Sequence, residues 1–517
     1  MNAAVWLARQ AAERPDHPAL AHGARTLSYG ELADRVGRLA ACLRAAGLRH
    51  GDRVAAIQWN GPALLETLLA CFHGGFCVVP VNARATPHEA AEVLGDAQVS
   101  AVVYDPEYGE HVEAIPCELR VALCTRDDGT GTEELDHALQ RAGAPAPIAP
   151  SDLDDVAWLF YTSGTTGRPK GAMLTHRNLL TMVMAYLADL RDPGRDGVVL
   201  HAAPLTHGGG LYALPPLARG ATQVITESRS FDPGEVLETI ARRGVTDIAF
   251  LTPTMVKWLV QARPPRRGEL ATLEHVTYGG APMYVEELQS ALDAFGPVFS
   301  QIYGQAEAPV TISRLSRADH VAGLEREPEL LASAGRAYTN VAAAVASDDG
   351  SIVAAGEGEL VTRSDAVMRG YWNNPEATAQ SLRDGWLHTG DVGRISDDGL
   401  VFLLDRNKDV IISGGANIYP REVEEVILRH GSVDQVAVVG APDETWGERV
   451  VAVVVPAADT DPERLGGELD ALCREYLSGY KRPRSYDWRA ALPVSPYGKI
   501  LKREIRDEYW DRGGRQI

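Results

Sequence analysis

The feature that most restricts the fold of this chain is the alternation of short apolar runs with amphipathic stretches between about residues 27 and 310. Short apolar runs bounded by glycine and polar residues are typical of buried strands. Such runs are Arg53–Ile57, Val99–Tyr104, Val198–His201, Ala221–Ile225, Asp247–Leu251 and Glu274–Tyr278. Helical periodicity occurs between them, for example over Tyr29–Ala46 and Pro233–Arg243. This alternation predicts an α/β fold with two parallel-type sheets flanked by helices, in which ligands bind at the carboxyl ends of the strands.

The pattern changes after residue 335. Asp348-Asp349-Gly350 and Asp397-Asp398-Gly399 each separate two short β-like runs, which is typical of hairpins. A helix over Arg421–Arg429 and another near 462–477 accompany two apolar strands farther on. The sequence thus predicts an N-terminal domain over 1–404, with α/β sheets to about 334 and an antiparallel, β-barrel-like subdomain over 335–404. A hinge over 405–415 and a small, mobile α+β C-terminal domain over 416–517 complete the expected organisation.

Composition excludes several classes of function. The net charge of −20 over 517 residues argues against a nucleic-acid partner, because phosphate backbones attract basic surfaces. The chain contains neither a secretory signal pattern nor a run of about 18 apolar residues that could span a membrane. Its six cysteines are scattered without a C-x-x-C pair, which is typical of reduced thiols rather than of a metal site. We expect a cytoplasmic protein, either a monomer or a homodimer.

A polar loop, Tyr161–Gly171, follows the apolar run Val156–Phe160. Its glycines permit close backbone approach, and its hydroxyl groups and amides can donate to phosphate oxygens. The pattern of a Walker A loop cannot be fitted to it. A strand that leads into such a loop is a usual place for a polyphosphate to bind, so the loop predicts a nucleotide site.

The loop matches the signature of the ANL superfamily of adenylate-forming enzymes, which includes acyl-CoA synthetases, peptide-synthetase adenylation domains and luciferases. The resemblance extends over essentially the whole chain through several motifs in the family's order. It implies that the chain activates a carboxylic acid as an acyl-adenylate, with ATP, Mg²⁺ and CoA. It also implies that ATP is bound by Thr162, Ser163, Gly164, Thr165, Thr166, Gly167 and Lys170, and that Thr162 contributes to the metal site.

Two motifs resemble those that line the nucleotide and acyl sites in that family. Tyr278-Gly279-Gly280-Ala281-Pro282 implies a backbone that lies along the adenine and the acyl group. Tyr303-Gly304-Gln305-Ala306-Glu307 resembles the motif in which the tyrosine stacks on adenine and the glutamate binds Mg²⁺, a cation that prefers oxygen ligands. The family commonly has a hydroxyl group where this chain has Ala306, and Gln305 or water is a candidate replacement.

Three further motifs resemble those that surround the ribose and the hinge. Asp391, in Leu387–Asp391, is implied to accept from the ribose hydroxyls, and Arg406 also approaches the ribose. Lys408 corresponds to the pivot between the domains. Lys499, in Pro496–Ile500, corresponds to the catalytic lysine, and only six of the chain's 50 lysine and arginine residues are lysines. A mobile ammonium group can stabilise the charge that develops as pyrophosphate leaves.

The acyl site is expected around Ala202–Gly210, where His207 resembles a gating or carboxylate-orienting residue. The three glycines Gly208, Gly209 and Gly210 suggest room for a guest, and the tyrosines suggest an apolar or aromatic one. The predicted substrate pocket consists of His207, Gly208, Gly209, Tyr212, Tyr278 and Gly279. The default substrate is a monocarboxylic fatty or aromatic acid, because the motifs for a dicarboxylate or an amino acid are absent.

The resemblance also implies that CoA contacts Ser413, Gly414, Gly415, Trp446 and Lys481. A carrier-protein thiol is the alternative acceptor, since fatty-acyl-AMP ligases share an alanine at the position of Ala306. Those ligases also have an insertion after this motif, for which the segment from Glu307 to Gly335 is too short. A third possibility is a non-catalytic homologue that binds a nucleotide or an acyl group. The presence of both Glu307 and Lys499 argues against it.

Overall fold

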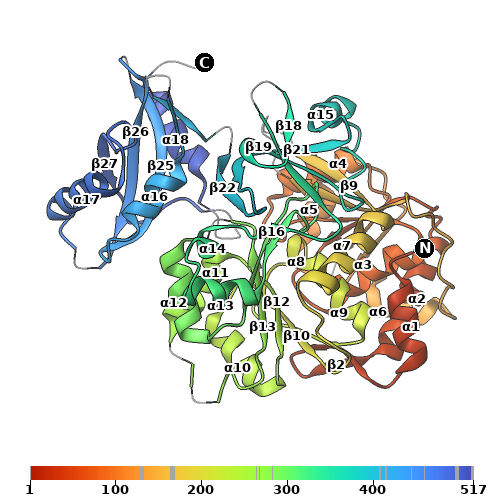
Figure 1. Cartoon of the computed structure of the whole chain (residues 1–517). Coiled ribbons are helices and arrows are strands. Elements are labelled where there is room, and N and C mark those ends of the chain that lie inside the picture. Colours follow the sequence, from red (N-terminus) through yellow and green to blue (C-terminus); the bar gives the residue numbers. More distant parts are fainter. Residues whose placement is uncertain are drawn as a thin grey trace.

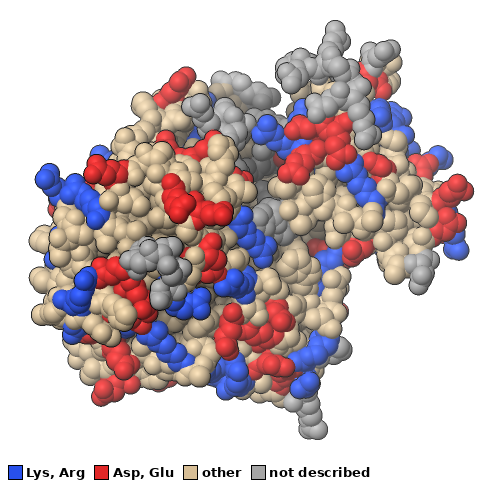
Figure 2. All heavy atoms as spheres, turned by 180° about the vertical axis from the view of Figure 1, so that it is seen from behind, with Lys and Arg blue, Asp and Glu red and all other residues tan. Residues whose placement is uncertain are grey.

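The structure is a computed structural model. It describes residues 2–126, 133–162, 169–263, 265–266, 268–281, 283–347, 350–406, 409–413, 416–443, 445–458, 460–494 and 500–513. A large body contains three sheets and a smaller lobe contains a fourth (Figure 1). Acidic and basic side chains are interspersed over the face in Figure 2, without a broad basic area. Within the described part of the chain, no helix is long and apolar enough to cross a membrane.

The largest sheet has nine strands in the order β16-β15-β14-β13-β12-β10-β11-β1-β2. Its central strands are parallel, whereas the pairs at its two edges are antiparallel. Apolar side chains fill the space between one face and the covering helices α10 (Pro233–Arg243), α11 (Pro253–Ala262) and α12 (Val285–Phe295). The strands are β1 (Pro18–His22), β2 (Arg25–Ser28), β10 (Val198–His201), β11 (Thr222–Ile225), β12 (Asp247–Leu251), β13 (His275–Gly279), β14 (Phe299–Tyr303), β15 (Ser313–Leu315) and β16 (Arg336–Ala337).

A second sheet has seven strands in the order β7-β6-β5-β3-β4-β8-β9. It is parallel except for the hairpin of β8 and β9, whose connection contains most of the predicted phosphate loop. The strands are β3 (Arg53–Ile57), β4 (Cys77–Pro80), β5 (Ala101–Tyr104), β6 (Val121–Cys124), β7 (Glu133–Glu134), β8 (Val156–Thr162) and β9 (Lys170–Thr175). The predicted strands and the α/β class are therefore confirmed.

Helices surround both sheets (Figure 1). α2 (Tyr29–Ala45) begins with a capping box, in which Ser28 and Glu31 exchange side-chain and backbone hydrogen bonds. The other described helices of the first 332 residues are α1 (Val5–Glu13), α3 (Pro62–Gly74), α4 (Pro87–Ala97), η1 (Pro106–Tyr108), α5 (Gly109–Glu113), α6 (Leu135–Arg141), α7 (His176–Asp189), α8 (Gly208–Leu211), α9 (Leu214–Arg219), α13 (Arg317–Glu325) and α14 (Glu329–Ala332).

The third sheet has six strands and is antiparallel throughout, as the hairpin signals predicted. Gly399, with φ of +85°, turns the hairpin between β21 and β22. Among the described strands the pairing forms an open sheet and does not close into a ring. The elements are β17 (Ala342–Ala346), β18 (Ile352–Val353), β19 (Gly356–Arg363), α15 (Pro375–Ser381), β20 (Leu382–Arg383), β21 (Trp386–Ile395) and β22 (Val401–Arg406).

The fourth sheet, in the smaller lobe, has five strands and two apolar layers. Its long hairpin of β25 and β26 packs against helices, in agreement with the predicted α+β pattern. The predicted hinge range, 405–415, includes the end of β22 and the whole of β23. The elements are β23 (Ile411–Ser413), β24 (Ala416–Ile418), α16 (Pro420–Ile427), β25 (Val433–Asp443), β26 (Gly447–Pro456), α17 (Pro462–Tyr476), β27 (Ser485–Trp488) and α18 (Lys502–Gly513).

Polar contacts join the smaller lobe to the helical side of the nine-stranded sheet. The Tyr284 hydroxyl donates to Glu424 Oε2 over 2.9 Å, and an Arg421 guanidinium nitrogen lies 3.4 Å from the Met283 carbonyl oxygen. Lys257 donates to the backbone carbonyl of Asp434 over 2.6 Å. The lobe is therefore held by directional bonds beside the loop that ends β13.

Buried histidines give the fold a specific response to acid. Burial lowers the pKa of His176, His201 and His320 to about 4 and that of His275 to about 3. An unfolded histidine titrates near its ordinary value of 6.5, so the unfolded chain takes up these protons first as the pH falls. The stability that these neutral rings contribute is complete above about pH 6.5 and is lost as the pH falls towards 4.

We expect the free energy of unfolding to decrease by about 1 kcal/mol per pH unit for each such histidine between pH 6.5 and 4.5. Urea unfolding at pH 7.0, 6.0 and 5.0 measures the slope. His320→Gln, which keeps an amide beside the Tyr278 hydroxyl, should have a shallower slope than the unaltered protein. Equal slopes for the two proteins would show that His320 is not one of the groups that destabilise the fold in acid.

Candidate active site

Two sheets meet at Asp391. This residue, on β21 of the antiparallel sheet, is 8% exposed. At the end of β14 in the nine-stranded sheet, the Tyr303 hydroxyl and the Gln305 amide nitrogen donate to its Oδ2 over 2.8 Å and 2.7 Å. Three residues predicted to bind the nucleotide, from two distant parts of the sequence, are thereby brought together. The paired carboxylate is suited to accept hydrogen bonds from neutral hydroxyl groups such as those of a ribose.

The seven-stranded sheet reaches the same place, because Lys170 on its strand β9 contacts Tyr371, a residue between β19 and α15. The Tyr371 hydroxyl donates to Glu307 Oε1 over 2.7 Å, and the Lys170 ammonium lies 5.3 Å from the centroid of the Tyr371 ring. Burial and the adjacent Glu307 carboxylate raise the pKa of Tyr371, so its phenol remains a neutral donor. The predicted metal ligand and the predicted phosphate-binding lysine therefore contact the same tyrosine. Sequence reasoning missed Tyr371, which lies in none of the motifs identified from the sequence.

The segment around Tyr371 is fixed by backbone hydrogen bonds to β9. The Trp372 N–H donates to the Gly171 carbonyl over 2.8 Å, and the Met173 N–H donates to the Gly370 carbonyl over 2.9 Å. Glu307 is fixed in the same way, because its carbonyl accepts from the Met368 N–H over 2.7 Å. These bonds hold Glu307 and Lys170 at one edge of the site.

The predicted phosphate loop is described only at its two ends. Thr162 and Lys170 are opposite each other in the β8–β9 ladder, so the loop leaves and re-enters one hairpin. A methyl group on Gly171 would lie 2.8 Å from the Tyr161 ring, which explains glycine at that position. Ser163, Gly164, Thr165, Thr166 and Gly167 lie outside the described residues.

The loop after β13 has the open backbone that the sequence predicted. Gly280 has φ of +78°, and a methyl group there would meet only Phe250, at 3.4 Å. Gly279 has another reason for its small size, since a methyl group would lie 2.4 Å from the Ile302 carbonyl oxygen on β14. Ala281 follows in a half-buried position, and Pro282 lies outside the described part of the chain.

Gly304 permits a tight turn below the nucleotide motif. A methyl group on it would lie 2.7 Å from the Val310 Cα atom, so the chain after Glu307 folds closely back on β14. Val310 itself has φ of +54°, an uncommon conformation for a β-branched residue. Such strain persists only where the surrounding structure determines it, and it often occurs beside functional sites.

His207 lies beside the strand that leads into the phosphate loop. Its ring meets the Phe160 ring edge-on, with the centroids 5.8 Å apart, and Phe160 precedes Thr162 by two residues. Burial lowers the pKa of His207 to about 4, so the ring is neutral near pH 7. A neutral imidazole can orient a carboxylate through a hydrogen bond but supplies no fixed positive charge.

The glycines after His207 differ from the expectation that all three leave room for a guest. A methyl group on Gly209 would lie 2.5 Å from the Pro204 carbonyl oxygen, and one on Gly210 would lie 2.1 Å from that of Leu205. Both glycines therefore permit close packing of the short helix α8. Gly208 alone of the three has no heavy atom within 4 Å of that position, and it leaves open space.

The two predicted pocket tyrosines have buried side chains. Tyr278 is fully buried, and its hydroxyl lies 3.0 Å from Gln301 Oε1 and 2.9 Å from His320 Nε2. Tyr212 is 2% exposed and stacks on Phe250, with the ring centroids 5.0 Å apart. The Tyr278 side chain thus packs within the core on the helical side of β13, whereas Phe250 connects Tyr212 to Gly280.

The Gln305 side chain, a candidate replacement for the hydroxyl group missing at Ala306, is directed towards Asp391. Its amide nitrogen already donates to Asp391 and, over 2.8 Å, to the Thr389 carbonyl. Ala306 packs with its methyl group against the main apolar core. The amide thus serves to orient Asp391.

The predicted catalytic lysine, Lys499, lies outside the described residues, as do Lys408, Gly414, Gly415 and the side chain of Arg406. The residues that flank the Lys499 segment are nevertheless joined to each other. Val494 and Ile500 form an isolated bridge, and the Leu501 N–H donates to the Pro493 carbonyl over 2.9 Å. The backbone of Arg406 is opposite Asp391 in the ladder of β21 and β22.

Two of the predicted CoA contacts are neighbours in the small lobe. Ser413 pairs with Gly447 across the sheet, directly beside Trp446, whose side chain is 51% exposed. Lys481 is engaged elsewhere, because its ammonium lies 2.7 Å from both carboxylate oxygens of Glu422. Burial lowers the pKa of Lys481, but the ion pair with Glu422 outweighs burial and raises the pKa above its ordinary value. A phosphate group would have to compete with Glu422.

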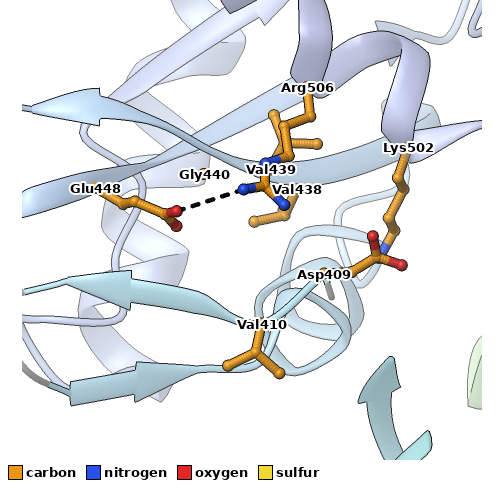
Figure 3. Close-up of a pocket in the computed structure, with 8 residues that line it drawn as sticks. All are labelled: Asp409, Val410, Val438, Val439, Gly440, Glu448, Lys502 and Arg506. Carbon is orange, nitrogen blue, oxygen red and sulfur yellow. Dashed lines mark ion pairs between the residues drawn. The ribbon is translucent and has the colours of Figure 1, made fainter. Parts of the chain in front are cut away.

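Lys502, at the start of α18, belongs to a buried polar contact. Its ammonium lies 2.8 Å from Oε1 of Glu424, a carboxylate that is 1% exposed and also accepts from Tyr284. Lys502 also lines a small pocket with Asp409 and Arg506, beside the ion pair of Arg506 with Glu448 (Figure 3). This pocket lies between the predicted hinge range and α18.

The described side chains include no group of three or more histidine, cysteine, aspartate or glutamate residues that could hold a metal ion. Mg²⁺ does not require such a group, since it is usually bound by one or two carboxylates together with substrate phosphates and water. Glu307, half-buried and oriented by Tyr371, fits that role.

Comparison with known families agrees with this geometry. The family model described as "AMP-binding enzyme" matches residues 7–372, and "AMP-binding enzyme C-terminal domain" matches residues 422–499. Among solved structures, the amide bond synthetase McbA from Marinactinospora thermotolerans superposes with a TM-score of 0.88 at 30% identity, over 98% of this chain and 100% of that one. The o-succinylbenzoate CoA synthetase MenE of Bacillus subtilis, in complex with an acyl-adenylate, has a TM-score of 0.82 at 29% identity over 97% and 98%.

The sequence relatives are ligases of acids to thiols. A feruloyl-CoA synthase of an Amycolatopsis species is 42% identical over 98% of both chains. The medium/long-chain-fatty-acid–CoA ligase FadD8 of Mycobacterium tuberculosis is 33% identical over 97% of this chain and 89% of its own. The fatty acid–[acyl-carrier-protein] ligase ScoC of Streptomyces coeruleorubidus is 34% identical over 98% and 96%. The chain therefore belongs to the AMP-binding enzyme family, among its ATP-dependent acid–thiol ligases.

Proposed function

We propose that this ligase activates an aromatic monocarboxylic acid and passes the acyl group to CoA, with its nucleotide held where the three sheets meet. The convergence of Tyr303, Gln305 and Asp391 carries this proposal, because it supplies a buried, oriented acceptor for a ribose. An aromatic acid is favoured over a fatty acid because a relative that is 42% identical over nearly the whole chain is named for a feruloyl group. Aromatic rings beside Gly280 are consistent with such a guest.

In the proposed first step, a carboxylate oxygen of the acid attacks the α-phosphorus of ATP, and the bond to the pyrophosphate oxygen breaks. Mg²⁺ neutralises charge on the phosphates when it is bound. Glu307 is proposed to hold the metal, and Lys499 to stabilise the charge that develops on the oxygens of the reacting groups. His207 orients the carboxylate as a neutral donor, because its pKa of about 4 leaves the ring uncharged.

In the proposed second step, the smaller lobe reorients about Lys408 and the thiolate of CoA attacks the acyl carbon, releasing AMP. Ser413 and the exposed Trp446 are neighbours on one edge of the lobe's sheet and form the proposed CoA contact. An indole face suits the stacking of an adenine ring, and Lys481 suits a phosphate.

A carrier-protein thiol is the second candidate acceptor. Two observations favour it: Ala306 has no hydroxyl group, and one relative is named as an acyl-carrier-protein ligase. The short segment between Glu307 and Gly335 favours CoA. The two acceptors differ in whether thioester formation requires a second protein.

Pyrophosphate release with a panel of aromatic and fatty acids, with and without CoA, tests the proposed function. We expect release with an aromatic acid and accumulation of its CoA thioester when CoA is present. Aromatic acyl-adenylate that CoA never consumes would favour the carrier-protein acceptor. Release with fatty acids alone would contradict the aromatic substrate class.

Lys499→Ala tests the role assigned to the lysine in the same assay. The loss of one charge-stabilising donor typically slows chemistry about 10²–10³-fold, so pyrophosphate release should fall by that factor. Thioester formation from pre-made acyl-AMP should change far less, because Lys499 is assigned to the first step only. An equal loss in both steps would contradict this division.

Tyr371→Phe tests the site residue that the structure adds. Removal of a hydrogen bond to a charged group costs about 1.5–3 kcal/mol, so kcat/KM for MgATP should fall about 10–150-fold and more Mg²⁺ should be needed. Tyr509→Phe is the control, since it also loses a phenol–carboxylate hydrogen bond, to Asp487 in the small lobe. An unchanged dependence on Mg²⁺ would show that Tyr371 does not position Glu307.

Lys481→Met should raise the KM for CoA about 10-fold or more, because a hydrogen bond to a charged phosphate is lost. CoA-independent pyrophosphate release should not change. Glu422→Gln should lower the KM for CoA, since it removes the competing carboxylate. Steady-state kinetics with varied CoA measure both, and a KM for CoA that neither change alters would exclude Lys481 from the CoA site.

A further inference from the structure

Tyr212 carries a buried hydroxyl group for which the described residues supply no hydrogen-bond partner. The residue follows the short helix α8 and is 2% exposed. A buried hydroxyl that has lost its hydrogen bonds to water costs about 1–3 kcal/mol. Native proteins contain few such groups, so each requires an explanation, such as a bound molecule that supplies the missing hydrogen bond.

The surroundings of this hydroxyl are aromatic. The Tyr212 ring is stacked on Phe250 at an interplanar angle of 12°, and Tyr186 meets it edge-on at a centroid distance of 5.8 Å. The same apolar cluster contains Ile302 and Tyr338. The neighbouring Tyr186 hydroxyl lies 3.4 Å from Thr277 Oγ1, so it differs from that of Tyr212 in having a polar neighbour. Flat rings arranged in this way favour a flat guest, because aromatic rings stack or meet edge-on.

Tyr212 is also connected to the predicted acyl wall. The Phe250 ring lies 3.4 Å from the position that a methyl group on Gly280 would occupy, and the same ring stacks on Tyr212. Gly208, four residues before Tyr212, faces open space. The edge of the Phe250 ring thus faces Gly280 in the substrate loop, while its face packs on Tyr212.

We propose that Tyr212 determines specificity for a hydroxyaryl acid, by forming a hydrogen bond with a ring hydroxyl of the substrate. This inference rests on the acid–CoA ligase function proposed above and names the substrate class of the same site. A site built to bond a hydroxyl rejects an analogue that lacks it, since the protein's own polar group is then left buried and unpaired. A fatty acyl chain would leave the Tyr212 hydroxyl without a hydrogen-bond partner.

The burial of Tyr212 also determines how this contact works. Burial raises the pKa of its phenol well above the ordinary value, so the group is a neutral donor and acceptor near pH 7. It can therefore accept from a phenol or donate to a phenolate. The substrate ring can retain its own proton.

Tyr212→Phe tests the inference with 4-hydroxycinnamate and cinnamate, which differ by one ring hydroxyl. The unaltered enzyme should prefer 4-hydroxycinnamate about 10–100-fold in kcat/KM, as one buried hydrogen bond permits. In Tyr212→Phe this ratio should fall towards one, through a loss with 4-hydroxycinnamate and little change with cinnamate. Pyrophosphate release measures both acids in the same assay.

Tyr186→Phe is the matched control, because it removes a hydroxyl from the same aromatic cluster that already has a polar neighbour. Its selectivity ratio should equal that of the unaltered enzyme. Thermal unfolding supplies a second readout: removal of an unpartnered hydroxyl should leave the Tm of Tyr212→Phe unchanged or higher.

Three results would overturn the inference. A selectivity ratio that Tyr212→Phe does not alter would show that the hydroxyl does not contact the guest. Equal losses with both acids, together with a lower Tm, would show that it is structural. Turnover of fatty acids but of neither cinnamate would exclude the substrate class while adenylate formation stood, whereas no pyrophosphate release with any acid would contradict the proposed function itself.

Discussion

The hydrogen bonds to Asp391 are the constraint on which the rest of the site depends. Asp391 belongs to the antiparallel sheet, and its two described donors, Tyr303 and Gln305, lie at the end of β14 in the nine-stranded sheet. A carboxylate that is only 8% exposed must be compensated by such donors, since an unpaired buried charge costs several kcal/mol. The two sheets are therefore held in one relative position, and the nucleotide motif is oriented before any ligand binds. Preorganised polar groups of this kind need not rearrange during the reaction.

The second constraint is the contact between the smaller lobe and the substrate loop. Glu424 is almost fully buried and accepts from Tyr284, which follows the loop that contains Gly279 and Gly280, while it is also paired with Lys502 at the start of α18. The chain that closes the Lys499 loop leads directly into that helix. The position of the lobe is thus coupled to the loop that lines the acyl site. A reorientation of the lobe away from this loop must break the hydrogen bond between Tyr284 and Glu424. This bond therefore stabilises the observed orientation relative to one in which it is absent.

Much of the fold could be predicted from the sequence, because apolar periodicity and turn residues are local signals. The strands Arg53–Ile57 and Asp247–Leu251 and the hairpin at Gly399 follow from such signals. Side-chain direction was less accessible. Gly209 and Gly210 suggested open space, but their missing methyl positions are filled by backbone atoms that belong to the preceding turn. Tyr371 could not be found at all, because its contact with Glu307 joins residues 64 positions apart, and nothing near it in the sequence marks the contact.

The same distinction explains why the reaction is easier to identify than the acid. Groups that bind ATP are charged or polar and occur in motifs, so the sequence alone indicates Asp391 and Glu307. The proposed acyl site consists of ordinary core residues such as Phe250 and Tyr212, whose residue types do not differ from those of any packed interior. What distinguishes Tyr212 is the absence of a hydrogen-bond partner for its hydroxyl among the described residues, a property of the folded chain. Since a fully apolar guest would leave that hydroxyl unpaired and a ring hydroxyl would satisfy it, this energetic imbalance is the basis of the proposed substrate class.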